Sequence, residues 1–135
     1  MKTLALILTL GVVALSGCYL ELEENTHPGG LYDADLKVTW RIDGSQSTGY
    51  CDSYGIAQWE VEVRGPDPRT IHVDCRAHYW SSESDFYNLL EGNYSVIVRA
   101  LDSADYVLAE QRSSLSLVDS GFVETLSFQF YPSDF

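Results

Sequence analysis

An alternating stretch, Leu36-Lys37-Val38-Thr39-Trp40-Arg41-Ile42, decides the fold class of this chain. Apolar and polar side chains change places at every residue along it. Because successive side chains of a β-strand point to opposite faces, this period of two indicates a strand with one buried and one solvated face. We therefore expect the four apolar residues of the stretch to point into a core.

The same period recurs along the rest of the chain. It predicts further strands at residues 59–64, 71–76, 94–101, 106–110, 115–117 and 122–130. Connections rich in Gly, Pro, Asp and Ser, such as Gly65-Pro66-Asp67-Pro68, separate these strands. Residues 79–90 are predicted to be irregular, with room for one helical turn at 84–90. The pattern predicts an all-β protein, an antiparallel two-sheet sandwich of about seven strands.

One corner of the predicted sandwich carries a resemblance to a known fold. Leu90-Glu91-Gly92-Asn93-Tyr94-Ser95-Val96 resembles the turn and penultimate strand of fibronectin type III and immunoglobulin-like domains. The resemblance implies that Leu90 is the core residue of the corner, that Gly92 makes its turn and that the Tyr94 hydroxyl donates a hydrogen bond there. It concerns the fold alone, because such sandwiches host many functions.

The first residues have the three parts of an export signal: Lys2, an apolar run over residues 4–15, and the small residues Ser16 and Gly17. Leu15-Ser16-Gly17-Cys18 resembles the lipobox of bacterial lipoprotein precursors. The resemblance implies that residues 1–17 are removed and that Cys18 carries lipid, so that the chain is exported and anchored to the cell envelope. Tyr19 stands where an aspartate would imply inner-membrane retention, which favours the outer membrane. The alternative is a plain secretory signal with Cys18 present by chance.

Three segments follow from these signals. Residues 1–17 are the expected signal peptide, and residues 18–34, which are acidic and contain His27-Pro28-Gly29-Gly30, are the expected flexible tether. Residues 35–135 form the expected immunoglobulin-like domain. The two resemblances together suggest a small envelope lipoprotein with an immunoglobulin-like mature part.

Composition and charge limit the partners. The chain has 135 residues, of which 45% are hydrophobic, so it can bury a real core. Its net charge of −12 repels nucleic acid and anionic head groups, and we expect no nucleic-acid partner. The pairs Asp33/Asp35 and Asp102/Asp105 do not complete a calcium-loop pattern, and turn aspartates explain them more simply.

The cysteines point to a disulfide. Once Cys18 carries lipid, Cys51 and Cys75 remain in a compartment that favours disulfides. A bridge between them would stabilise the fold by roughly 3.5 kcal/mol in the chain-entropy model. The alternative, a catalytic thiol paired with His72 or His78, has no supporting signature.

No motif predicts catalysis or a cofactor. The sequence has no nucleophile elbow, zinc-protease motif, phosphate loop or dinucleotide fingerprint. His72, Asp74, Arg76 and His78 would share one side of a strand, but the two histidines would lie roughly 20 Å apart at about 3.3 Å per residue. We expect this side to be solvated, with no metal and no cofactor.

Aromatic residues supply the one candidate binding patch. A disulfide between Cys51 and Cys75 would bring two aromatic groups to one end of the sandwich, and these are Tyr50, Tyr54, Tyr79, Trp80, Phe86 and Tyr87. Exposed aromatic residues on loops suit a sugar or a protein partner, whereas the simpler alternative is that they cover the end of the core. The predicted function is a non-enzymatic binding or structural module of the envelope. The alternative is a carbohydrate-binding module that uses the aromatic loops on a polysaccharide.

Overall fold

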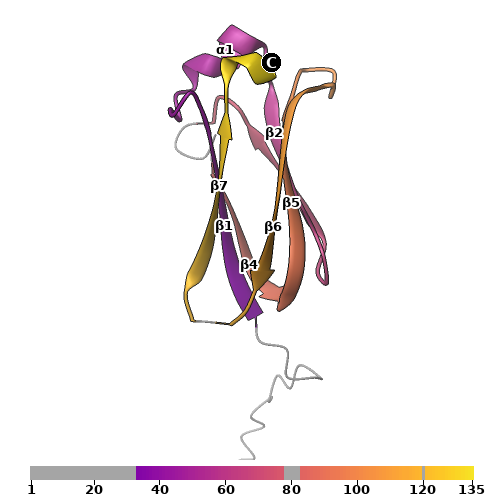
Figure 1. Cartoon of the computed structure of the whole chain (residues 1–135). Helices are drawn as coiled ribbons and strands as arrows, with labels where there is room; N and C mark the ends of the chain where they lie inside the picture. Colours follow the sequence, from indigo (N-terminus) through magenta and orange to yellow (C-terminus); the bar gives the residue numbers. More distant parts are fainter. Residues whose placement is uncertain (1–32, 78–82, 120) are drawn as a thin grey trace, which may run out of the picture.

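The computed structural model describes residues 33–77, 83–119 and 121–135. These residues form seven strands, one short α-helix and one 3-10 helix (Figure 1). The elements are β1 (Asp33–Ile42), α1 (Gly49–Tyr54), β2 (Gln58–Arg64), β3 (Arg69–Asp74), β4 (Glu83–Leu90), β5 (Gly92–Leu101), β6 (Val107–Leu117), β7 (Val123–Phe130) and η1 (Pro132–Asp134). Cys18, the predicted signal at 1–17 and the predicted tether up to residue 32 lie outside the described residues.

The strands form two packed sheets, with the orders β4-β1-β7 and β3-β2-β5-β6 (Figure 1). This confirms the predicted all-β sandwich. One pair departs from the antiparallel expectation, because β1 and β7 are parallel, with Asp35 opposite Val123 and Ile42 opposite Phe130. The reason is that β6 finishes at the end of the sandwich where β1 begins, and β7 then crosses to the other sheet and lies beside β1. Because β7 and β1 start at the same end, they run in the same direction.

The core lies between the sheets. Leu36, Val38, Trp40 and Ile42 are at most 4% exposed, as the alternation of β1 predicts. They meet the inward face of the opposite sheet, which includes Trp59, Val61, Val63, Val96 and Val98. Trp40 and Trp59 pack with their ring centroids 5.6 Å apart. Burial of these large apolar surfaces is the main stabilising contribution to such a fold.

The local predictions were wrong at three places. Residues 83–90, expected to be irregular, form β4, which pairs with β1 over Thr39↔Glu83 to Asp33↔Leu90. Residues 107–117, expected as two short strands, form the single strand β6. Phe122, the first residue of the predicted strand at 122–130 and apolar like the core residues, precedes β7 and is 79% exposed. β5 is consequently the third strand from the end and not the penultimate one.

The sandwich has two distinct ends, which we name for use below. The helix end carries α1, η1 and the turn between β5 and β6 (Figure 1). The entry end carries the start of β1 at Asp33, the turn between β4 and β5, and the connection from β6 to β7 (Figure 1).

Candidate functional site

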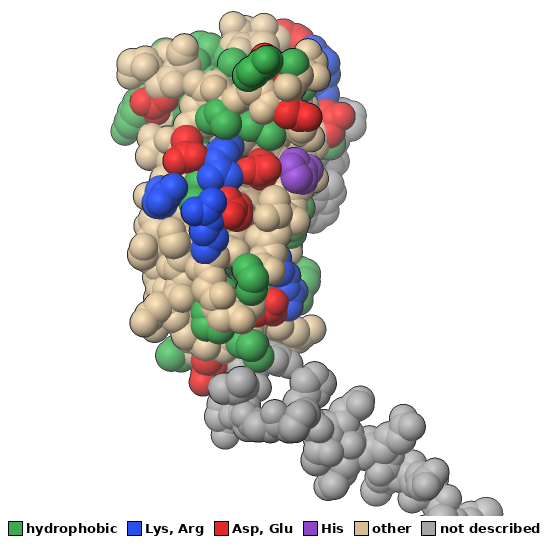
Figure 2. Space-filling view, turned by 90° about the vertical axis from the view of Figure 1, so that its right-hand side faces the viewer, with side chains coloured by type: hydrophobic (Ala, Val, Ile, Leu, Met, Phe, Trp, Pro, Cys, Tyr) green, Lys and Arg blue, Asp and Glu red, His purple; other side chains and the backbone are tan. Residues whose placement is uncertain are grey.

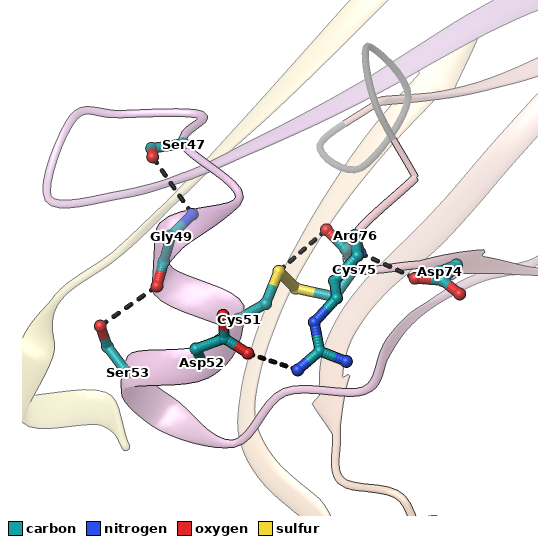
Figure 3. The surroundings of a disulfide bond; sticks show 8 residues. All are labelled: Ser47, Gly49, Cys51, Asp52, Ser53, Asp74, Cys75 and Arg76. Atoms are coloured by element: carbon teal, nitrogen blue, oxygen red, sulfur yellow. Dashed lines mark hydrogen bonds and ion pairs between the residues drawn. A yellow bond between two sulfur atoms is a disulfide. The ribbon is translucent and has the colours of Figure 1, made fainter.

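The predicted disulfide is confirmed. The sulfur atoms of Cys51 and Cys75 are bonded, their Cα atoms lie 5.8 Å apart, and both residues are 2% exposed. Cys51 lies on α1 and Cys75 directly follows β3, so the bridge holds the helix against the end of the four-stranded sheet (Figure 3). An ion pair between Asp52 and Arg76 makes a second link beside it.

The four predicted aromatic residues that the structure describes do not form one patch. Tyr50 and Tyr54 lie on α1, half-buried, with ring centroids 5.9 Å apart. Tyr54 also stacks on Phe135 at 4.5 Å, so part of this pair covers the helix end of the core. Phe135 was not expected here, because nothing local in the sequence indicates that the last residue folds back onto a helix more than 80 positions earlier. Tyr79 and Trp80 lie outside the described residues.

Phe86 and Tyr87 correct the prediction further. Phe86 lies on β4 opposite Leu36 and is 1% exposed, so it belongs to the core and is not available to a ligand. Tyr87 follows it on the strand, points outward and is 55% exposed. Tyr87 lies in the second half of β4, which runs toward the entry end, whereas Tyr50 and Tyr54 lie on α1 at the helix end. The strand period, which was not expected at these residues, separates the two side chains.

The corner at β5 has the hydroxyl contact that the resemblance implied. The Tyr94 hydroxyl donates to the Leu90 carbonyl oxygen at 2.8 Å and accepts from the Asp67 N–H at 3.2 Å. Burial raises the pKa of Tyr94, while the Asp67 N–H lowers it in part. Leu89, and not Leu90, is the fully buried residue of the corner. These contacts tie the β2–β3 turn to the start of β5, which makes the corner a structural element.

A ladder of polar side chains crosses the outer face of the four-stranded sheet. His72 on β3, Glu60 on β2, Arg99 on β5 and Glu110 on β6 lie directly opposite one another in register. His72 Nε2 lies 3.1 Å from Glu60 Oε2, and Arg99 Nε donates to Glu110 Oε2 at 2.6 Å. Arg99 Nη1 also donates to Glu62 Oε2 at 2.8 Å. Figure 2 shows these acidic and basic side chains gathered on the upper part of this face.

Arg99 is the centre of this ladder. Burial lowers the pKa of its guanidinium, but hydrogen bonds to Glu110, Glu62 and Glu60 outweigh burial and raise the pKa well above its usual value. A hydrogen bond from Arg64 lowers the pKa of Glu62, although burial opposes this shift. Arg99 thus donates charge-assisted hydrogen bonds to Glu60, Glu62 and Glu110, and these bonds hold the four side chains in fixed positions.

Ile97 lies on the same outer face and is nevertheless fully buried. It stands two positions before Arg99, with Glu62 and Arg112 as its cross-strand partners. Long charged side chains can cover apolar surface with their methylene stems while their heads stay in water. Glu62 and Arg112, which flank Ile97 on the neighbouring strands, are placed to cover it in this way.

A shallow groove lies beside the ladder, toward the helix end. It is lined by Gln58, Glu60, His72, Arg99, Leu101, Asp105 and Val107, and its volume is about 580 Å³. Gln58 Nε2 donates to Asp105 Oδ1 at 2.7 Å, which fixes the position of two polar groups on the wall. Amide, carboxylate and imidazole groups that converge on one groove can hydrogen-bond to a polar ligand. We take this groove as the candidate binding site.

Two further findings concern the described part of the chain. In residues 33–77, 83–119 and 121–135, no three His, Cys, Asp or Glu side chains are grouped closely enough to hold a metal ion. None of the helices in those ranges is both long enough and apolar enough to cross a bilayer.

No family model, no curated protein and no solved structure matches this chain. The fold and the site therefore define only a class, which is an all-β sandwich with a buried disulfide and a polar groove on its four-stranded sheet.

Sequence reasoning found some of the groove and missed its organisation. The strands predicted at 59–64 and 71–76 alternate apolar and polar residues, which puts Glu60 and His72 on outward faces, and the structure has both there. Arg99 lies between the small or branched apolar residues Val98 and Ala100, and Glu110 follows Ala109, so only their charge within apolar surroundings could have indicated them. What joins these residues is the register between strands, which depends on pairings across up to 39 positions of sequence.

Proposed function

We propose that this chain is an exported lipoprotein, anchored to the cell envelope through lipid on Cys18, whose sandwich is a non-enzymatic binding or structural module. The sequence Leu15-Ser16-Gly17-Cys18 after an apolar run supports the anchor. The Tyr94 corner supports a relation of fold to immunoglobulin-like and fibronectin type III domains. The outer membrane is the proposed location, because Tyr19 stands where a retention signal would need aspartate.

The Cys51–Cys75 bridge is the observation that carries this proposal. Both half-cystines are buried at the junction of α1 and the sheet, so the bridge is part of the folded structure and not a surface accident. Disulfides form and persist in oxidising compartments outside the cytosol. A structural disulfide therefore supports export, which the amino-terminal segment suggests independently.

The groove supports the binding role. Its polar groups are positioned before any ligand arrives, since Glu60 and Arg99 are held by the ladder and Gln58 is held by Asp105. Such preorganisation lowers the entropy that binding must overcome. An envelope protein is the proposed partner. A polysaccharide is the second candidate. The amide and carboxylate groups that line the groove suit sugar hydroxyls, so the groove supports this candidate better than the separated aromatic residues do.

The anchor is tested with Cys18→Ser in the intact chain, expressed in a bacterium that processes lipoproteins. We expect the variant to lose fatty-acid labelling and to accumulate as the unprocessed precursor. Ser16→Ala, which keeps a small residue before the cleavage site, is the matched control and should be labelled and processed normally. Equal labelling of Cys18→Ser and the parent would overturn the proposal.

The groove is tested by affinity capture from an envelope extract and by retention on cell-wall polysaccharide. His72→Ala should weaken whichever interaction the parent protein shows, because His72 lines the groove and is half-exposed. Thr70→Ala is the matched control, since Thr70 is an exposed residue on the same strand outside the groove lining. Equal capture by all three proteins would remove the groove from the proposal.

A further inference from the structure

The entry end of the sandwich exposes an unusual group of apolar side chains. Val118, Phe122 and Val123 are 53%, 79% and 50% exposed, and they lie within six positions of one another. Most other large apolar side chains exposed to this degree in the described residues are tyrosines, which carry a hydroxyl for water. Exposed apolar groups that cluster in this way mark interaction sites more often than isolated ones do. We call these three residues the apolar tip.

Hydrogen bonds shape the chain around the apolar tip. The Asp119 N–H donates to Glu91 Oε1, which lies in the turn between β4 and β5. The Gly121 N–H donates to Asp119 Oδ1 at 3.1 Å, and Gly121 has a φ of +69°, which favours glycine. These two hydrogen bonds hold the backbone at Asp119 and Gly121, which lie between Val118 and Phe122 in the sequence.

The tip lies where the chain enters the domain. Val123 is the register partner of Asp35 in the parallel β1–β7 pair, two residues after β1 begins (Figure 1). Asp33 follows Cys18 by 15 positions. A chain of that length spans at most roughly 50 Å when fully extended, at about 3.4 Å per residue. The helix end lies at the other end of β1 from Asp33, and the 10 residues of β1 span about 33 Å.

We propose that the apolar tip rests on the bilayer as a second membrane contact beside the lipid on Cys18. This inference depends on the proposed anchor, because one contact of three side chains is too weak to hold a protein alone. The anchor keeps the tip at high local concentration near the lipid surface. Contact at this end directs α1 and the groove away from the membrane, toward a partner.

The charges around the tip indicate which lipid it accepts. Glu91, Asp119 and Glu124 lie in the same turns or directly beside the tip, and all three are carboxylates. Anionic head groups would repel them, whereas zwitterionic head groups would not. The fitting surface is therefore a neutral phospholipid surface.

The test uses the full lipidated protein reconstituted into phosphatidylcholine vesicles with brominated acyl chains, which quench tryptophan fluorescence on contact. Phe122→Trp places a reporter in the tip. Tyr106→Trp is the matched control, because Tyr106 is an aromatic residue that is 71% exposed in the β5–β6 turn at the opposite end. The parent protein supplies the baseline from its own three tryptophans.

We expect the added fluorescence of Phe122→Trp to be quenched and shifted to the blue, and that of Tyr106→Trp to be unaffected. Phosphatidylglycerol in the vesicles should reduce the quenching at position 122. Equal responses of the two variants in protein that floats with the vesicles would overturn the inference and leave the anchor standing. Protein that does not float would overturn the anchor and the inference together. Stronger quenching in anionic vesicles would contradict the assignment to neutral lipid.

Discussion

Glu60 and Arg99 face each other directly across strands β2 and β5, and their side chains form an ion pair on the outer face of the sheet. Arg99 also pairs with Glu62 and Glu110, and its side chain is only 15% exposed. One guanidinium thus balances three carboxylates from two neighbouring strands. Arg99 on β5 therefore stands between two carboxylates of β2 and one carboxylate of β6, and its charge reduces the repulsion between them.

Loss of Arg99 should therefore destabilise the fold. Arg99→Met keeps the apolar stem but leaves three carboxylates without their central partner, and we expect a loss of about 2 kcal/mol, in the range for hydrogen bonds to charged groups. Arg112→Met is the matched control, because Arg112 is 54% exposed and lies 3.6 Å from Glu110. Its effect should stay within about 0.5 kcal/mol. Urea unfolding of the oxidised proteins measures both.

The same ladder predicts a pH dependence. Hydrogen bonds from Arg64 and Arg99 lower the pKa of Glu62 below its ordinary value of 4.5 despite partial burial. A carboxyl whose pKa is lower in the folded state stabilises the fold above its unfolded pKa and loses that contribution as pH falls through its folded pKa. The stability difference between the parent and Glu62→Gln should be full at neutral pH and shrink below about pH 4.5. Glu124→Gln, at an exposed site on β7, is the control, and its stability should differ little from that of the parent protein. Thermal unfolding of both variants and the parent from pH 3 to 7 measures these differences.

The corner hydroxyl should contribute measurably to stability. Tyr94→Phe removes the donor to the Leu90 carbonyl and the acceptor for the Asp67 N–H, so two partly buried backbone groups lose a partner. We expect a loss of about 1–2 kcal/mol in the free energy of unfolding. Tyr106→Phe, at an exposed site, should be neutral. An equal effect of the two substitutions would mean that the corner contacts contribute nothing.

Gly92 should resist replacement for two reasons. Its φ is +145°, and a Cβ there would stand 2.7 Å from Pro66 Cγ. We expect Gly92→Ala to destabilise the protein by about 2–3 kcal/mol, since backbone strain alone is on the order of 1–2 kcal/mol. Gly44→Ala tests strain without a clash, because φ is +74° and no atom lies within 4 Å. Adding Pro66→Ala to Gly92→Ala should restore only the part due to the clash.

The disulfide should stabilise the fold mainly by lowering the conformational entropy of the unfolded chain. Replacing both Cys51 and Cys75 by alanine should lower the free energy of unfolding by roughly 3.5 kcal/mol, because the bridge closes a loop of about 25 residues in the unfolded chain. Dithiothreitol should lower the melting temperature of the parent protein toward that of the double variant and leave the double variant unchanged. A response of the double variant to the reductant would show that another sulfur is involved.

The local alternation of the sequence was enough to predict the sandwich and the buried face of β1. The period of two predicted that four residues would be buried, and these are Leu36, Val38, Trp40 and Ile42. The prediction holds because successive side chains of a strand point to opposite faces, so alternation along the sequence indicates the buried face. The disulfide also followed from the sequence, because the proposed lipid on Cys18 would leave Cys51 and Cys75 as the two remaining cysteines. By contrast, β4 was not predicted, because its exposed side includes Asp85 and Asn88, residues that are also typical of loops.

What the sequence by itself determined is the class of fold, the inward faces of its clearest strands and the pairing of its cysteines, because each depends on spacing along the chain. The tertiary structure alone decided that β7 runs parallel to β1, that Phe86 is buried while Phe122 is exposed, and that Arg99 meets three carboxylates. These features depend on which distant strands pair and in which register. The pairing and register of the strands minimise the free energy of the whole chain, so they cannot be predicted from a local sequence pattern.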